Sequence, residues 1–196
     1  MIRPEDIRQA LTHPAPSASS DFDYAPDLRP PPRGLRPAAI LMALTEGPSG
    51  LEVILTRRAS HLRNHPGQVA FPGGKVEETD PNLWAAATRE AQEEIGLVGV
   101  EPLGALQGHE SVTGFEISPQ VGLVTGPFSP VPDPNEVEEV FHVPLDFLMN
   151  PANMQLHKRP WRGVERGYLA IPYGPHYIWG ASARMIKNMS ERLEAK

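Results

Sequence analysis

Three glutamates within one predicted helix carry the clearest chemical signal in this chain. Glu93 and Glu94 follow Glu90 by three and four residues. Residues at these spacings are neighbours on a helix surface. Like charges there repel one another by a few tenths of a kcal/mol per pair, so the cluster weakens the helix unless a cation joins it. Carboxylate oxygens suit hard divalent ions such as Mg²⁺ or Mn²⁺. The cluster therefore predicts a metal site, with a solvated acidic face as the alternative.

The residues around the glutamates favour the metal site over the solvated face. Gly73-Gly74 precedes the helix and predicts a turn whose backbone can approach a ligand closely. Arg89 directly precedes the first glutamate, and Gly96 is expected to end the helix. The glycine turn, the arginine and the glycine that ends the helix accompany the glutamates, so the metal site is favoured over an isolated acidic run.

An amphipathic pattern positions the glutamates on the helix. Asp80 is the expected N-cap and Pro81 the expected first helical residue. A turn of about 100° per residue puts four residues on one apolar stripe: Trp84, Thr88, Ala91 and Ile95. Glu94 lies closest to the edge of that stripe, and Glu93 lies furthest from it.

Positive charge is concentrated immediately before the acidic helix. The basic residues there are Arg57, Arg58, His61, Arg63, His65 and Lys75. A cationic loop beside a carboxylate cluster suits a complex of a metal with a diphosphate, and a solvated loop is the alternative. The whole chain has 18 basic and 24 acidic side chains and a net charge of −6, which argues against a broad nucleic-acid-binding surface.

The stretch from Gly74 to Leu97 resembles the Nudix box, G-x5-E-x7-R-E-U-x-E-E-x-G-U with U aliphatic. It departs from the box in two ways: Asp80 stands in place of the first glutamate, and eight residues instead of seven separate it from Arg89. The preceding residues Leu55–Gly74 fit L-T-x-R-x-x-x-L-R-x-H-x-G-Q-V-x-F-P-G-G. This longer pattern resembles the coenzyme A diphosphatase branch of the Nudix hydrolases.

The resemblance implies a fold, an activity and a set of metal ligands. The implied fold is an α/β/α sandwich around a mixed sheet. The implied reaction splits coenzyme A, its thioesters and its oxidised forms into 3′,5′-ADP and a 4′-phosphopantetheine fragment. The metal, Mg²⁺ or Mn²⁺, would be held by Glu90, Glu93 and Glu94, with help from a backbone carbonyl near Gly73 or Gly74.

The general base has several candidates. Some Nudix enzymes use a glutamate of the box, here Glu90 or Glu93, and others use a glutamate from a distant loop. Of the loop acids Glu136, Glu138 and Glu139, Glu139 is the chosen candidate. A solvated acidic edge is the alternative interpretation of this run.

Other residues are expected to bind substrate or to support the site. Arg57, Arg58 and Lys75 are the candidates for substrate binding, because cationic side chains suit phosphate oxygens. Arg89 is expected to be structural, to pair with Glu77 or Asp80, and not to share the face of Glu90. Four aromatic residues are candidates for stacking on adenine, with core packing as the alternative: Trp161, Tyr168, Tyr173 and Trp179.

Two other functions stay open. One is a Nudix enzyme of broader specificity that acts on ADP-ribose, NADH or dinucleoside polyphosphates. The other is a non-catalytic nucleotide-binding module, which is disfavoured because all three glutamates of the box are present.

The rest of the chain predicts the frame around this stretch. Residues 1–37 are expected to form a helix over 4–11 followed by a proline-rich arm, and residues 38–196 the Nudix domain. The predicted elements before residue 150 are strands over 37–44, 51–56, 68–71 and 98–106, a hairpin over 110–125 with Gly114 near its turn, an alternating stretch over 135–145 and a helical turn over 144–149. After it come strands over 161–170 and 171–178 around a turn over 173–176, and a helix over 180–194. This order indicates an α+β fold with a mixed sheet.

Composition sets further bounds. No apolar run approaches the roughly 18 residues that cross a bilayer, and the N-terminal residues lack the apolar core of a secretory signal. The chain contains no cysteine, so neither disulfides nor thiolate metal sites are expected. We therefore expect a cytoplasmic protein without a membrane or nucleic-acid partner, and the arm allows a homodimer.

Overall fold

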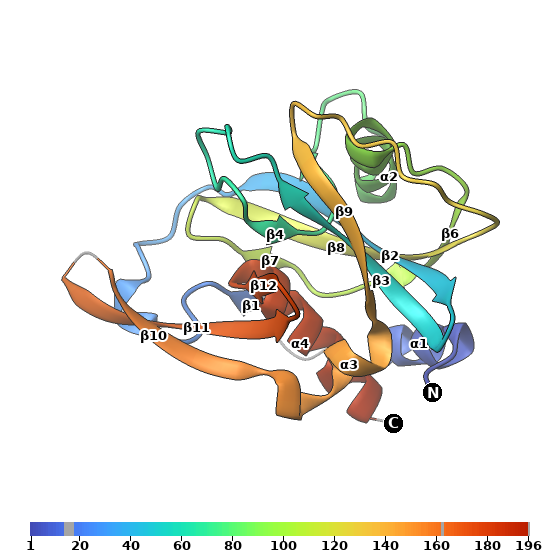
Figure 1. Cartoon of the computed structure of the whole chain (residues 1–196). Coiled ribbons are helices and arrows are strands. Elements are labelled where there is room, and N and C mark those ends of the chain that lie inside the picture. The colour runs from blue at the N-terminus through green and yellow to red at the C-terminus, as the bar shows by residue number, and fades with distance from the viewer. Residues whose placement is uncertain (14–17, 162, 196) are drawn as a thin grey trace.

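The computed structural model of the chain describes residues 1–13, 18–161 and 163–195, and the side chain of Trp161 lies outside this description. Its centre is a mixed β-sheet (Figure 1). The main path of the sheet consists of β1 (Ser19–Ser20), β7 (His109–Glu110), β8 (Phe115–Val124), β2 (Arg36–Gly47), β3 (Gly50–Arg58) and β4 (Val69–Ala70). Further strands are β5 (Gly73–Lys75) on β2, β6 (Val100–Ala105) on β8 and β9 (Val137–Pro144) on β3.

Parallel and antiparallel pairs occur side by side in this sheet. β2 runs parallel to β8 and antiparallel to β3, and β1 runs parallel to β7. The expected mixed sheet is therefore confirmed.

Strand β2 is buried on both faces and separates two apolar layers. Successive side chains of a strand point to opposite faces, so Ala39, Leu41 and Ala43 pack with helix α2 (Leu83–Ile95). The residues between them contribute to the larger core on the other face. The small alanines allow α2 to lie close to the sheet.

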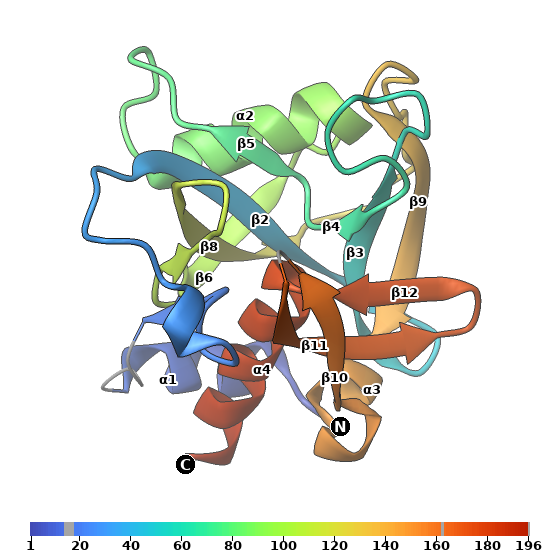
Figure 2. The same cartoon turned by 90° about the vertical axis from the view of Figure 1, so that its left-hand side faces the viewer.

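Three helices cover the other face of the sheet (Figure 2). They are α1 (Pro4–Thr12), α3 (Leu145–Met149) and α4 (Ala181–Glu194). Each inserts apolar side chains into the same core, among them Ile7, Leu148 and Ile186. Helices on both faces of a mixed sheet confirm the predicted α/β/α arrangement. None of these helices, nor any other in the described part of the chain, has the length and apolar character of a membrane span.

A separate three-stranded antiparallel sheet extends from the main body (Figure 1). It consists of β10 (Gln155–Trp161), β11 (Val164–Tyr173) and β12 (His176–Trp179). Two short 3-10 helices, Pro26–Leu28 and Pro151–Asn153, complete the secondary structure.

Most elements predicted from the sequence are present. The first helix, the hairpin of β2 and β3, the strand after α2, the turn at Gly114 and the last helix lie where the patterns placed them. The arm after α1 adds β1 to the sheet beside β7 and buries Phe22. The division of the chain between residues 37 and 38 stays a prediction.

The expected strands over 161–170 and 171–178 are wrong in their boundaries, whereas the turn expected over 173–176 is present between β11 and β12. A single strand, β11, continues from Val164 to Tyr173 through the predicted break, and β12 begins only at His176. No pattern in the sequence indicated β10, the partner of β11. β10 is an edge strand rich in charged residues and proline, so it lacks the apolar alternation by which strands are recognised.

The predicted start of α2 is also wrong. Asn82 is the N-cap: its side-chain oxygen accepts a hydrogen bond of 2.9 Å from the backbone N–H of Ala85. Asp80 is unavailable for capping because its carboxylate binds Arg89. At the other end, Gly96 has φ 71° and ends the helix as expected.

We expect Asn82→Ala to lower the free energy of unfolding by about 1 kcal/mol, because the amide of Ala85 loses its acceptor. Asn82→Ser keeps a capping oxygen and should stay close to the wild type. Urea denaturation measures both variants. Equal stability of Asn82→Ala and the wild type would show that this cap contributes nothing.

Candidate active site

The three glutamates of α2 lie in three different environments. Glu94 is only 5% exposed and lies on the buried face of the helix with Ala91. The side chain of Glu90 is 16% exposed, whereas that of Glu93 is 60% exposed. The helix therefore directs Glu90 and Glu94 toward the sheet and Glu93 toward solvent.

The carboxylates of Glu90 and Glu94 contact strand β5. The backbone N–H of Gly73 donates a hydrogen bond of 3.1 Å to Oε2 of Glu94. Glu90 lies against Gly74, where an added Cβ would come within 2.5 Å of the carboxyl carbon. A side chain at this position would force the Glu90 carboxylate to move from the place it occupies.

The expected turn at Gly73-Gly74 is wrong, because both residues belong to a strand. They pair with Ile40 and Ala39 of β2. An added Cβ on Gly73 would collide with the backbone of β2 at Ala39. The close backbone approach inferred from these glycines is present, but between β5, β2 and α2.

Mutual repulsion links the two carboxylates to a third one. Burial raises the pKa of Glu94 to about 8, the hydrogen bond from Gly73 opposes this rise, and the charges of Glu136 and Glu90 add to it. Burial likewise raises the pKa of Glu90, against the effect of Arg89. Glu136, just before β9, acts on both glutamates. Acids that disfavour one another's ionisation in this way form a site for positive charge.

This set of donors fits a hard divalent cation. In the described part of the chain, no three acidic or histidine side chains already converge as a finished metal site would. Glu90 and Glu94 nevertheless offer oxygen ligands on one face of α2, and Glu136 brings a further negative charge. Oxygen ligands of this kind match Mg²⁺ or Mn²⁺, and an added cation would offset their repulsion.

Arg89 joins the helix to the loop before it. Its Nε and Nη2 donate to the two carboxylate oxygens of Asp80, at 3.0 Å each. Its Nη1 donates to Glu90 at 3.1 Å and to Glu93 at 3.0 Å. Its Nη2 also donates to the backbone carbonyl of Lys75, at 3.1 Å. The bidentate pair with Asp80 is a strong arrangement and lowers the pKa of that carboxyl.

The ion pairs of Arg89 bear on two expectations from the sequence. Asp80 is its carboxylate partner in the loop, one of the two considered from the sequence. Arg89 and Glu90 are adjacent and so project from different sides of the helix, but the long side chain of Arg89 still reaches the Glu90 carboxylate. Arg89 thereby fixes the direction of Glu90 and holds Glu93 on the solvent side.

Two of the other predicted site residues bind each other. Arg57 and Glu139 are cross-strand partners in β3 and β9. Nε of Arg57 donates to Glu139 at 2.9 Å, and its Nη1 lies 3.1 Å from Glu138. His176 lies 3.7 Å from the other oxygen of Glu139. Arg57 and Glu139 are thus engaged in a network between strands, whereas Glu136 makes no ion pair with the described residues.

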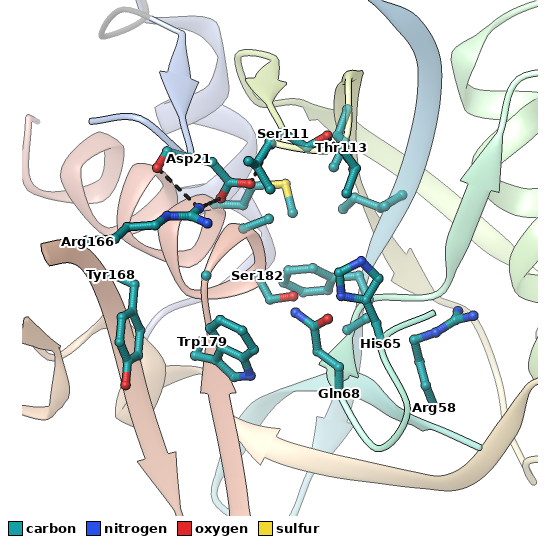
Figure 3. A pocket seen from close by; sticks show the side chains of 18 of the residues that line it. Asp21, Arg58, His65, Gln68, Ser111, Thr113, Arg166, Tyr168, Trp179 and Ser182 are labelled. Carbon is teal, nitrogen blue, oxygen red and sulfur yellow. Dashed lines mark hydrogen bonds and ion pairs between the residues drawn. The ribbon is translucent and has the colours of Figure 1, made fainter. Parts of the chain in front are cut away.

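Arg58 lies between the carboxylates and a cavity of about 270 Å³. Its charge acts to lower the pKa of Glu94, and its side chain lines the cavity beside His65 and Gln68 (Figure 3). Lys75 is exposed, and the contact to its backbone carbonyl comes from Arg89. Of the three cations predicted to bind substrate, Arg58 is the one that faces both regions.

The far wall of the cavity includes charged residues that no sequence pattern indicated. Asp21 of the arm, Arg159 of β10 and Arg166 of β11 line it. Tyr168 and Trp179, two of the proposed stacking residues, also line it (Figure 3). Tyr173 packs against Phe147 instead, and the side chain of Trp161 lies outside the described residues. No spacing rule connects these positions, because strand pairing and the return of the arm bring them together.

We expect the metal-free protein to lose stability with rising pH through Glu94. Its pKa is about 8 in the folded chain against an ordinary value of 4.5, so folding takes up a proton between these values. The contribution of Glu94 to the free energy of unfolding is thus full below the lower value. It declines above it, by at most about 1.4 kcal/mol per pH unit, until the carboxyl ionises in the folded state.

Glu94→Gln should remove this decline, because the amide has no proton to release. Urea denaturation of both proteins in EDTA, from pH 5 to pH 8, measures the difference between them. The variant should gain on the wild type as the pH rises. Parallel pH profiles would contradict the assignment of this titration to Glu94.

Comparison with known proteins identifies the family. The model of the NUDIX domain matches residues 34–162. The chain is 38% identical over 165 residues to the "Uncharacterized Nudix hydrolase NudL" of Enterobacter sp. (strain 638), covering 82% of this chain and 84% of that protein. A protein of the same name from Salmonella paratyphi B is 37% identical over 164 residues, with the same coverage.

Solved structures share the fold at low sequence identity. The NUDIX domain of Shewanella oneidensis NrtR, complexed with ADP ribose, has a TM-score of 0.53 at 18% identity and covers 87% of this chain and 94% of its own. A MutT/nudix family protein from Enterococcus faecalis has a TM-score of 0.52 at 16% identity, covering 86% and 65%. The domain match and the identity to NudL proteins show that the chain belongs to the Nudix hydrolases, whose reaction is the hydrolysis of diphosphate linkages.

Proposed function

We propose that this Nudix hydrolase acts on coenzyme A and its derivatives, splitting their diphosphate linkage into 3′,5′-ADP and 4′-phosphopantetheine or its acylated form. The observation that carries the proposal is the position of Arg58 between the buried carboxylates and a cavity that also contains Arg159 and Arg166. Arg58 belongs to the stretch Leu55–Gly74, whose pattern resembles the coenzyme A diphosphatases. A cationic cavity beside the acidic site suits a substrate with phosphate groups in both places.

The proposal includes a divalent metal, Mg²⁺ or Mn²⁺, on which Nudix enzymes typically depend. Glu90 and Glu94 are the proposed ligands, with the backbone at Gly74 beside them and Glu93 at the solvent side. When bound, the ion would neutralise negative charge on the phosphate oxygens. Support comes from the raised pKa values of Glu90 and Glu94 and from the space that Gly74 leaves for a carboxylate.

Hydrolysis also needs a group that takes a proton from the attacking water. We assign this role to Glu136 in preference to Glu139, Glu90 or Glu93. The water oxygen forms a bond to one phosphorus, the bridging P–O bond breaks, and the other phosphate leaves with the electron pair while Glu136 takes the proton. Glu136 is exposed and close enough to act on Glu90 and Glu94, whereas Glu139 is bound by Arg57.

The substrate assignment predicts a clear order of activities. With Mg²⁺ or Mn²⁺, the purified protein should cleave coenzyme A with a higher kcat/KM than ADP-ribose, NADH or a diadenosine polyphosphate. Mass spectrometry should identify 3′,5′-ADP among the products, and EDTA should abolish turnover. Faster cleavage of ADP-ribose would favour the broader Nudix enzyme, and absence of any turnover would favour a nucleotide-binding module.

The base assignment predicts different effects at three neighbouring acids. Glu136→Gln should lower kcat by about 10²- to 10⁴-fold. Glu138→Gln is the matched control for charge and should retain activity. Glu139→Gln should lower kcat less than Glu136→Gln, because Glu139 forms an ion pair with Arg57 between β3 and β9. A larger loss in Glu139→Gln than in Glu136→Gln would reverse the assignment.

A further inference from the structure

Two arginines stand directly opposite each other on the wall of the cavity. Arg159 of β10 and Arg166 of β11 are cross-strand partners, and both line the cavity next to Arg58. Like charges at directly opposite positions of a sheet destabilise it. The β10–β11 pair therefore places positive charge at the cavity against its own stability.

The two arginines differ in their partners. Arg166 is 8% exposed and lies 3.7 Å from the carboxylate of Asp21. Arg159 makes no ion pair with any residue that the structure describes, and its buried Nε has no hydrogen-bond partner there. A buried donor left without an acceptor is unfavourable, and none of the residues described in the structure supplies an acceptor for Arg159 Nε.

Aromatic rings hold the guanidinium of Arg159 in place. It lies 4.7 Å from the ring centroid of Trp179 and 5.5 Å from that of Tyr168. Figure 3 shows both rings on the cavity wall, on the side opposite Arg58. Stacking on aromatic faces fixes a guanidinium but leaves its N–H groups free to donate in its own plane. Arg159 is thus oriented in advance for a ligand.

The uncompensated charge of the cavity selects the chemistry of this ligand. Asp21, the acidic residue of the lining, is already bound by Arg166, and the hydroxyls of Ser111 and Thr113 bind each other at 3.0 Å. What remains is cationic, so the ligand group is an anion with several acceptor oxygens. Apolar side chains such as Phe71 and Met185 complete the lining and suit an adjoining nucleoside.

We propose that Arg159 binds a phosphomonoester on the ribose of the substrate, namely the 3′-phosphate of coenzyme A, and so determines specificity. This inference rests on the proposed function, because the 3′-phosphate distinguishes coenzyme A from ADP-ribose and NADH. A phosphomonoester carries between one and two negative charges at neutral pH and offers three acceptor oxygens. A guanidinium can bind two of them with parallel hydrogen bonds. Arg58 then faces the diphosphate at the other end of the cavity.

The kinetic test compares coenzyme A with 3′-dephospho-coenzyme A, which differs only in this phosphate. The wild type should prefer coenzyme A by at least tenfold in kcat/KM. Arg159→Gln should lower kcat/KM for coenzyme A by 10- to 100-fold and leave that for the dephospho form within about threefold. Arg159→Lys keeps the positive charge but loses the two parallel N–H donors of the guanidinium. Its kcat/KM for coenzyme A should lie between those of the wild type and Arg159→Gln. Equal losses on both substrates, or no loss on either, would overturn the proposal.

Lys158→Gln is the matched control. Lys158 is the neighbouring residue of β10, carries the same charge, and forms an exposed ion pair with Glu165 at 2.9 Å. Because successive side chains of a strand point to opposite faces, it lies on the face away from Arg159. Its substitution should leave the preference for coenzyme A unchanged. A loss of preference in this variant would show that net charge, and not the position of Arg159, is responsible.

A binding measurement separates this inference from the proposed function. Calorimetry with 3′,5′-ADP and 5′-AMP reports recognition of the 3′-phosphate without turnover. The wild type should bind 3′,5′-ADP at least tenfold more tightly, and Arg159→Gln should bind both alike. Failure to cleave coenzyme A, with this difference intact, would refute the activity and keep the site. Equal binding of both nucleotides by the wild type would refute the site, whatever the activity.

Discussion

The site depends on two carboxylates that helix α2 buries against strand β5. Removing a carboxylate from water is costly unless it is hydrogen-bonded, paired or neutralised. Among the described residues, the backbone N–H of Gly73 is the hydrogen-bond donor to the Glu94 carboxylate, and burial raises the pKa of Glu94 to about 8. The neighbouring elements make this burial feasible: alanines on β2 and α2 bring the helix close to the sheet, and Gly74 leaves space for Glu90. The packing of α2 against β5 thus holds two carboxylates together, and a positive charge beside them would be favourable.

The ion pair of Arg89 with Asp80 makes this arrangement rigid. It fastens the loop after β5 to the middle of α2, and the same guanidinium directs Glu90 and Glu93. The same ion pair forms despite the departure from the Nudix box. The extra residue lies between Asp80 and the N-cap Asn82 or in the first turn of the helix, so the spacing from Arg89 onward is unaffected. An aspartate at that position still binds the guanidinium with both oxygens.

The sequence was informative where function and local structure follow the same spacing. The helical pattern placed Glu90 and Glu94 near a buried stripe and Gly96 at its end, because these depend on neighbours three and four residues apart. Tertiary pairing decided the rest. Arg57 and Glu139 are partners only through the register of β3 with β9, so neither could be recognised as already bound. Arg159 escaped notice because its strand is an exposed edge, and its buried Nε becomes apparent only once the cavity is formed.

The distribution of charge gives the site a direction. The chain has a net charge of −6, yet one end of the site gathers carboxylates and the other gathers arginines, with Arg58 between them. A diphosphate alone would be drawn to the metal end, and a lone anion to the cavity. A substrate that carries negative charge at two places would satisfy both ends at once. Arg58 opposes the rise in the pKa of Glu94, so a residue that lines the cavity also helps to keep a proposed metal ligand ionised.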